Sequence, residues 1–153
     1  MSRLYLDACT IIYLLEASSV FQDLVIARLL EHRAKPDPLL LTSRLSRLEC
    51  RVVPLRNQDE GLLTAYEAFF SADRMIVIDV SATIIERATE LRARYGFKSP
   101  DALHLATAIE HKADAFLTSD GNLERCGEIT VEVLVAPEEE APFPGITGPA
   151  REP

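Results

Sequence analysis

The sequence predicts an α/β fold built around a central parallel sheet. Short apolar runs alternate with longer amphipathic stretches, which is the pattern of repeated strand–helix units. The run over residues 39–41 is apolar at every position, as expected for a strand buried on both faces. A length of 153 residues suits one domain with a full hydrophobic core.

Five short runs are predicted to be strands because they are apolar or rich in β-branched residues. They cover residues 4–6, 39–41, 75–78, 115–117 and 129–135. The sequence changes character after Ala136, where five of the nine prolines and a cluster of glutamates occur. We therefore expect a folded domain over residues 1–136 and a flexible or extended tail over residues 137–153.

The helices of the first half are predicted from caps and apolar stripes. Thr10 is a plausible N-cap for a short helix over residues 11–16. Apolar residues at helical spacing predict a second helix over residues 21–30, which two nearby prolines end. Thr42 or Ser43 can cap a third helix. Leu45, Leu48 and Val52 form its expected core stripe, and Pro54 is its expected end.

The helices of the second half carry clearer boundary signals. An apolar stripe predicts a helix over residues 62–70. Ser81 is placed to cap the next helix, and Gly96 is placed to close it. Ser99 as N-cap, with Pro100 at the first helical position, predicts the start of the last helix.

Composition limits the classes of function. The net charge of −8 is unusual for a nucleic-acid-binding protein, although the predicted tail carries −3 of it, so the charge neither excludes nor supports an RNA substrate. Cys9, Cys50 and Cys126 form no C-x-x-C pair, and we interpret them as small buried hydrophobes in a reducing cytosol. No apolar stretch reaches the length of a membrane span, and no signal peptide is recognisable, so a cytoplasmic location is expected.

Four acidic residues stand where strands end or helices lie. Asp7 follows the first strand, Asp120 follows the fourth, Asp101 lies at a helix start, and Glu49 lies in the third helix. Ligands of open α/β sheets bind at the carboxyl ends of the strands, so these acids are placed to converge. Gathered carboxylates repel one another unless a cation joins them, and oxygen ligands favour Mg²⁺ or Mn²⁺. The pattern indicates a metal-dependent hydrolase acting on phosphodiesters.

Each acid taken alone also has a structural interpretation. Asp7 suits a helix N-cap, and Asp101 is favoured by the helix dipole. Glu49 lies about 40° from Leu45 on a helical wheel, so it is expected to be a half-buried boundary residue. Asp120 before a glycine suits a turn.

His104 and three arginines near these acids in the sequence are expected to have structural roles. His104, three residues after Asp101, is interpreted as a packed, hydrogen-bonded residue rather than a catalytic one. Arg44, Arg47 and Arg51 share a helix face that points about 160° away from Glu49, which indicates a solvated face or a partner contact. No phosphate-binding glycine loop or nucleophile elbow occurs in the sequence.

Four segments together resemble the PIN domain family, and within it the VapC toxins of type II toxin–antitoxin pairs. They are YLDAC at residues 5–9, LSRLEC at 45–50, SPDALHLATA at 99–108 and FLTSD at 116–120. The resemblance spans about residues 4–135. It implies a three-layer α/β/α PIN-like fold and a Mg²⁺- or Mn²⁺-dependent ribonuclease that hydrolyses RNA with a metal-activated water.

The resemblance also assigns roles to residues. It implies an acidic cluster of Asp7, Glu49, Asp101 and Asp120, with Asp7 and Asp101 as the principal metal ligands and Thr118 in support beside the last acid. It further implies a VapB-like antitoxin whose tail enters the acidic groove. Exposed apolar positions on the helices over residues 21–30 and 62–70 are candidates for that contact or for a homodimer.

Three alternatives compete with this interpretation. One is a catalytically silent PIN module that scaffolds a complex, for which a broken acidic set would be expected, whereas the set here is whole. Another is a PIN-type nuclease acting on DNA. A haloacid-dehalogenase-type phosphatase would need a second Asp two residues after the first, and position 9 is Cys.

Overall fold

Five parallel strands in the order β3-β2-β1-β4-β5 form the centre of the computed structural model, which describes residues 1–16 and 19–137. The strands are β1 (Ser2–Leu6), β2 (Pro38–Ser43), β3 (Met75–Ile78), β4 (Ala115–Thr118) and β5 (Val131–Val133). All five predicted strands are present, with β5 shorter than expected. The predicted tail lies, apart from residue 137, outside the described residues.

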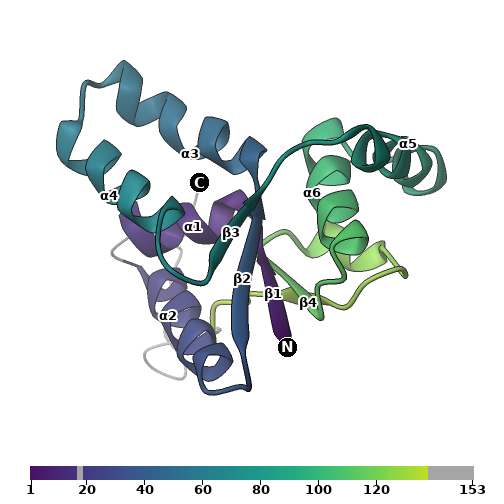
Figure 1. Ribbon diagram of the computed structural model, residues 1–153, viewed down its shortest axis with the longest axis horizontal. Coiled ribbons are helices and arrows are strands. Elements are labelled where there is room, and N and C mark those ends of the chain that lie inside the picture. The colour runs from purple at the N-terminus through teal and green to yellow at the C-terminus, as the bar shows by residue number, and fades with distance from the viewer. Residues whose placement is uncertain (17–18, 138–153) are drawn as a thin grey trace, which may run out of the picture.

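In the described residues, six α-helices and one short 3₁₀-helix, η1, surround the sheet (Figure 1). They are α1 (Ala8–Glu16), α2 (Val20–Arg33), α3 (Arg44–Arg56), α4 (Glu60–Phe70), α5 (Ala82–Tyr95), α6 (Ser99–Glu110) and η1 (Gly121–Arg125). Among the described residues, no single helix is long and apolar enough to cross a bilayer; only α1 and α2, taken as a bent pair, meet the criteria of length and composition.

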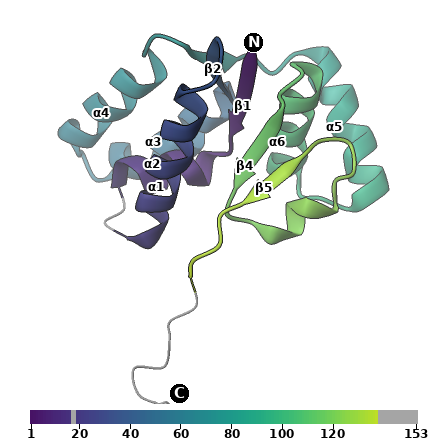
Figure 2. The same ribbon diagram turned by 90° about the horizontal axis from the view of Figure 1, so that it is seen from below.

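The helices cover both faces of the sheet and so make three layers. Figure 1 shows α1 to α4 on one side of the strands and α5 and α6 on the other, and Figure 2 shows the same separation from below. Side chains alternate across β1, so Leu4 and Leu6 enter one core with Tyr66, while Tyr5 enters the other with Phe116. The three-layer α/β/α fold is therefore confirmed.

Several predicted helix boundaries are confirmed by their capping contacts. The Ser43 hydroxyl accepts a hydrogen bond from the Leu45 amide at 3.1 Å, and Ser81 accepts one from Ile84 at 3.2 Å. Gly96 closes α5 with a φ of 72°, a left-handed conformation in which glycine avoids the strain of a side chain.

The predicted buried stripe of α3 was wrong. Leu48 and Val52 are 64% and 45% exposed, whereas Ser46, Cys50 and Pro54 are buried. This helix turns its small residues inward, where Ser46 contacts Thr42 at the end of β2 and Cys50 contacts the Ala8 carbonyl of α1. The periodicity gave the correct helix but could not say which face packs.

Three boundary predictions were also wrong. Pro54 lies inside α3, which continues to Arg56, because a proline in the last turn removes only one helical hydrogen bond. Thr10 lies in the first turn of α1 and donates its hydroxyl to the Asp7 carbonyl at 2.7 Å, so it is not the N-cap. Ser99 is the first residue of α6, and Lys98 is its N-cap.

His32 gives the fold a predictable response to acid. It is 3% exposed, and its Nε2 donates to the Leu39 carbonyl at 2.9 Å. Burial lowers the pKa of His32 below its ordinary value, and the charges of Arg28 and Lys35 lower it further. In the unfolded chain His32 therefore takes up a proton near pH 6.5, whereas in the folded chain it stays neutral until a lower pH.

We therefore expect the contribution of His32 to the free energy of unfolding to fall as the pH drops below about 6.5. Urea unfolding between pH 5 and pH 8 should show wild type losing its advantage over His32→Gln at the acidic end. Identical pH profiles for the two proteins would contradict this account.

Candidate active site at the carboxyl end of the sheet

Asp7 is the most tightly held of the four acids. It lies between β1 and α1, is buried, and its backbone N–H donates to the Leu117 carbonyl of β4 at 3.0 Å. Its Oδ1 accepts from the Ala8 amide at 2.9 Å, and its Oδ2 accepts from the Thr118 hydroxyl at 2.8 Å. The carboxylate thus accepts one hydrogen bond from the first residue of α1, rather than from the N2 or N3 amide of a typical N-cap, and one from a neighbouring strand.

Thr118 connects two of the acids. It ends β4, is completely buried, and donates to Asp7 while its Oγ1 accepts from the Asp120 amide at 3.1 Å. Asp120 itself is exposed, and its Oδ1 accepts from the Asn122 amide at 2.9 Å, which starts η1. The structural role predicted for Asp120 in a turn is therefore present, and it is compatible with a carboxylate at the site.

His104 connects the other acids. It projects from α6, is only 1% exposed, and its Nε2 lies 2.6 Å from Glu49 Oε1 and 3.7 Å from Asp7 Oδ1. Its Nδ1 lies 2.7 Å from the Tyr5 hydroxyl. Glu49 is half-buried, as predicted. The interpretation of His104 as a packed, hydrogen-bonded residue is confirmed, but sequence reasoning missed that its partner is one of the acids.

Asp101 lies one turn before His104 on α6, and the charges of the other three acids affect its pKa. Its pKa is raised, first by burial and then by the charges of Asp7 and Asp120, with a smaller effect from Glu49. The contacts through Thr118 and His104 place Asp7, Glu49 and Asp120 in one region, and Asp101 lies one helical turn from His104. The four acids that the sequence singled out therefore lie at the same end of the sheet.

The charge on His104 responds to the same cluster. Burial by itself lowers the pKa of His104, but the hydrogen bond to Glu49 and the charges of Asp7, Glu49 and Asp101 outweigh burial and raise it above its ordinary value. The acids therefore make His104 easier to protonate than burial alone would allow.

The chemistry of this donor set fits a hard divalent cation. The acids offer oxygen atoms alone, and their mutual repulsion is the type that Mg²⁺ or Mn²⁺ relieves. Within residues 1–16 and 19–137, however, no three His, Cys, Asp or Glu side chains are already gathered as a metal-holding group. Asp7 and Asp101 would hold such an ion, and coordination would have to draw the carboxylates closer.

Cys9 corrects one prediction made from the sequence. Cys50 and Cys126 are buried as predicted, but Cys9 is only partly buried, and its Sγ lies 3.6 Å from Asp7 Oδ2 and 3.4 Å from Ser119 Oγ. Burial and the charge of Asp7 raise the pKa of the Cys9 thiol. The group therefore stays protonated beside the acids and is a poor nucleophile.

The arginines of α3 lie apart from the acids, as predicted. Arg44 pairs with Asp79, and Arg47 pairs with Glu67 at 2.8 Å while its guanidinium lies over the Phe70 ring. These contacts belong to the outer surface of α3 and do not direct an arginine toward the acids.

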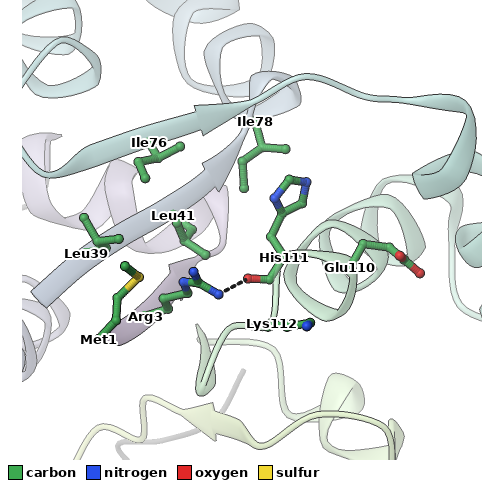
Figure 3. A pocket seen from close by; sticks show the side chains of 9 residues that line it. All are labelled: Met1, Arg3, Leu39, Leu41, Ile76, Ile78, Glu110, His111 and Lys112. Atoms are coloured by element: carbon green, nitrogen blue, oxygen red, sulfur yellow. Dashed lines mark hydrogen bonds between the residues drawn. The ribbon is translucent and has the colours of Figure 1, made fainter.

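An apolar pocket at the other end of the sheet is a separate feature. Leu39, Leu41, Ile76 and Ile78 line this pocket (Figure 3). Its volume is about 400 Å³. Arg3 lies at its edge and donates to the His111 carbonyl at 3.3 Å. None of the four acids contributes to this pocket, so it is not the candidate active site.

The family model of the PIN domain matches residues 4–129. Among solved structures, the chain is similar to VapBC2 from Rickettsia felis bound to a promoter DNA fragment, with a TM-score of 0.70, 19% identity, and coverage of 86% of this chain and 98% of that one.

Two further solved structures show the same fold. VapC20 from Mycobacterium tuberculosis, a sarcin–ricin loop cleaving toxin, gives a TM-score of 0.66 at 21% identity and covers 81% of this chain and 95% of its own. FitAcB from Neisseria gonorrhoeae gives a TM-score of 0.62 at 15% identity, and the match covers 84% of this chain and 95% of that one. A comparison with curated proteins gives no match.

The Thr118 contact predicts a specific mutational effect. Thr118→Val keeps the side-chain shape but removes the hydroxyl between Asp7 and Asp120. Loss of a supporting hydrogen bond to a metal-binding carboxylate typically costs about 10- to 100-fold in metal affinity or activity. We expect a loss of this size in Mn²⁺ affinity measured by calorimetry.

Thr107→Val is the matched control for this experiment, because Thr107 is equally buried but donates only to the Leu103 carbonyl of its own helix. Equal Mn²⁺ affinities for the two variants would show that the Thr118 hydroxyl does not support the site.

Proposed function

Because the chain belongs to the PIN domain family, we propose that it is a Mg²⁺- or Mn²⁺-dependent endoribonuclease that serves as the toxin of a VapBC-type toxin–antitoxin pair. The observation that carries the proposal is the convergence of Asp7, Glu49, Asp101 and Asp120 at the carboxyl end of the sheet, joined through Thr118 and His104. The whole acidic set argues against a catalytically silent scaffold.

The residues of the site divide the proposed work between them. Asp7 and Asp101 would hold the divalent ion, which when bound would lower the pKa of water and neutralise charge on the phosphodiester. The side chain of Glu49 is 31% exposed and Asp120 is exposed, so both carboxylates could accept hydrogen bonds from a water molecule and orient it. Thr118 keeps Asp7 in place.

The histidines argue against a cleavage route through the 2′-hydroxyl of RNA. That route uses two imidazoles as acid and base at one site. His104 is buried with both ring nitrogens engaged, and His32 is buried at the far end of the sheet. The exposed His111 follows α6 at the end opposite to Asp101, so no pair of histidines faces the acids. Hydrolysis by water is therefore the chemistry that this site supports.

Two partner proposals accompany the activity. The likeness to VapBC2, together with the sequence resemblance to the VapC toxins, supports a VapB-like antitoxin as a partner in the cytosol. Helix α2 exposes Ile26 and Leu30 as predicted, whereas α4 buries Tyr66 and Phe70 and offers less. The exposed Leu48 and Leu55 of α3 provide a second apolar face, so the molecule has surfaces for an antitoxin and for a second copy of itself.

Substitution of the proposed ligands tests the function directly. Asp7→Asn and Asp101→Asn should each abolish cleavage of a labelled RNA, a loss of at least about 10³-fold, because an amide cannot replace the charge that holds the ion. Asp79→Asn, which alters an exposed acid paired with Arg44, should cleave as wild type does. Full activity in both site variants, with unchanged circular dichroism, would refute the assignment.

Metal removal separates the remaining alternatives. The purified protein should lose RNA cleavage with chelator and regain it with Mg²⁺ or Mn²⁺, and labelled DNA of the same sequence should stay intact. Cleavage of DNA in preference to RNA would favour the alternative PIN-type DNA nuclease, and cleavage that persists in chelator would refute metal dependence.

A further inference from the structure

His104 holds a position that the proposed hydrolysis does not by itself explain. It is buried among acids, and both of its ring nitrogens have partners from other elements: Tyr5 from β1 and Glu49 from α3. A buried imidazole needs partners, but a packed histidine can find them on backbone carbonyls, as His32 does with Leu39. His104 instead links the central strand to a carboxylate of the site.

The direction of these hydrogen bonds follows from Tyr5. The Tyr5 hydroxyl lies 2.7 Å from His104 Nδ1, and a phenol carries its proton at neutral pH. In the neutral imidazole the Tyr5 O–H therefore donates to Nδ1, which places the imidazole proton on Nε2. The Nε2–H then donates to Glu49 Oε1, 2.6 Å away.

The start of this chain of contacts is rigid. Tyr5 is completely buried in the central strand, and its ring stacks on Phe116 of β4 with centroids 5.0 Å apart. Glu49, by contrast, stands on α3 with its side chain 31% exposed. Among the described residues, no hydrogen bond reaches its Oε2. A long, half-exposed side chain has rotamer freedom that a buried neighbour removes.

We propose that His104 is a positioning residue that fixes the Glu49 carboxylate beside Asp7 and leaves Oε2 free for the reaction, and that Tyr5 sets the orientation of His104. The inference rests on the proposed function, since it assigns Glu49 a task in hydrolysis. It adds a Tyr5–His104–Glu49 relay of hydrogen bonds, running from the sheet to the site, to the four acids. Such support of a carboxylate is typically worth about 10- to 100-fold in affinity or activity.

Two substitutions of His104 separate its two contacts. His104→Asn keeps a polar atom near Nδ1, facing Tyr5, but cannot reach Glu49. His104→Gln places an amide donor near the Nε2 position and keeps the contact with Glu49. We expect His104→Asn to lower kcat on RNA and to weaken Mn²⁺ binding by about 10- to 100-fold, and His104→Gln to recover most of both.

Tyr5→Phe tests the first contact with little risk to folding, since the new ring still stacks on Phe116. It should reduce kcat in the same direction but by less than His104→Asn does. His32→Asn is the matched control for the loss of a buried histidine, and it should leave Mn²⁺ affinity unchanged. Wild-type kcat and Mn²⁺ affinity in a folded His104→Asn protein would overturn the proposal.

A double-mutant cycle distinguishes positioning from general stability. In a Glu49→Gln background, His104→Asn should cause less than about a threefold further loss of kcat, because the carboxylate that it positions is gone. The same factor of loss in both backgrounds would show that His104 acts only on the fold, and would overturn the proposal.

A measurement on metal-free protein separates this inference from the proposed function. In ¹⁵N-histidine NMR spectra, His104 should carry its proton on Nε2, and its signals should shift in Glu49→Gln and in Tyr5→Phe. Wild type could cleave no nucleic acid and yet show these shifts and bind Mn²⁺ more tightly than His104→Asn. That result would refute the proposed nuclease activity and support the Tyr5–His104–Glu49 hydrogen bonds. Absence of both shifts overturns the relay, whatever the activity.

Discussion

The pairing of β1 with β4 is the constraint on which the rest of the site depends. Leu6 stands opposite Leu117 in the parallel register, and the Asp7 amide continues the ladder to the Leu117 carbonyl. Two residues 111 positions apart, Asp7 and Thr118, are thereby placed in hydrogen-bond contact. A shift of one residue would turn Asp7 to the opposite face of the sheet and remove that contact.

This convergence has an electrostatic cost that the fold offsets with fixed donors. The charge of the Asp7 carboxylate is compensated by hydrogen bonds from the Ala8 amide and the Thr118 hydroxyl, and that of Glu49 by a hydrogen bond from the His104 imidazole. Buried carboxylates without such donors would be strongly destabilising. The donors and the acids come from elements that only the complete sheet holds together, so the site forms only as part of the whole fold.

The sequence predicted the local features of this structure better than the tertiary ones. Strands, helix caps such as Ser81 and the positions of the four acids follow from short-range patterns, which the structure reproduces. The face that α3 buries could not be predicted, because Leu48 and Cys50 suit a helix equally well and only packing decides between them. Likewise, the spacing of His104 from Asp101 placed it near the acids but could not indicate Glu49 as its partner.

The four acids are unequally compensated, and the inequality indicates where a cation would act most strongly. Asp7, Glu49 and Asp120 each accept at least one hydrogen bond, whereas no hydrogen bond to the Asp101 carboxylate is found in the described part of the chain. Asp101 has the start of α6 in its favour, but burial and its neighbours raise its pKa nonetheless. A divalent ion shared by Asp7 and Asp101 would act most strongly on Asp101. It would neutralise the charge of the carboxylate that has the fewest protein partners and so relieve its repulsion by the other acids.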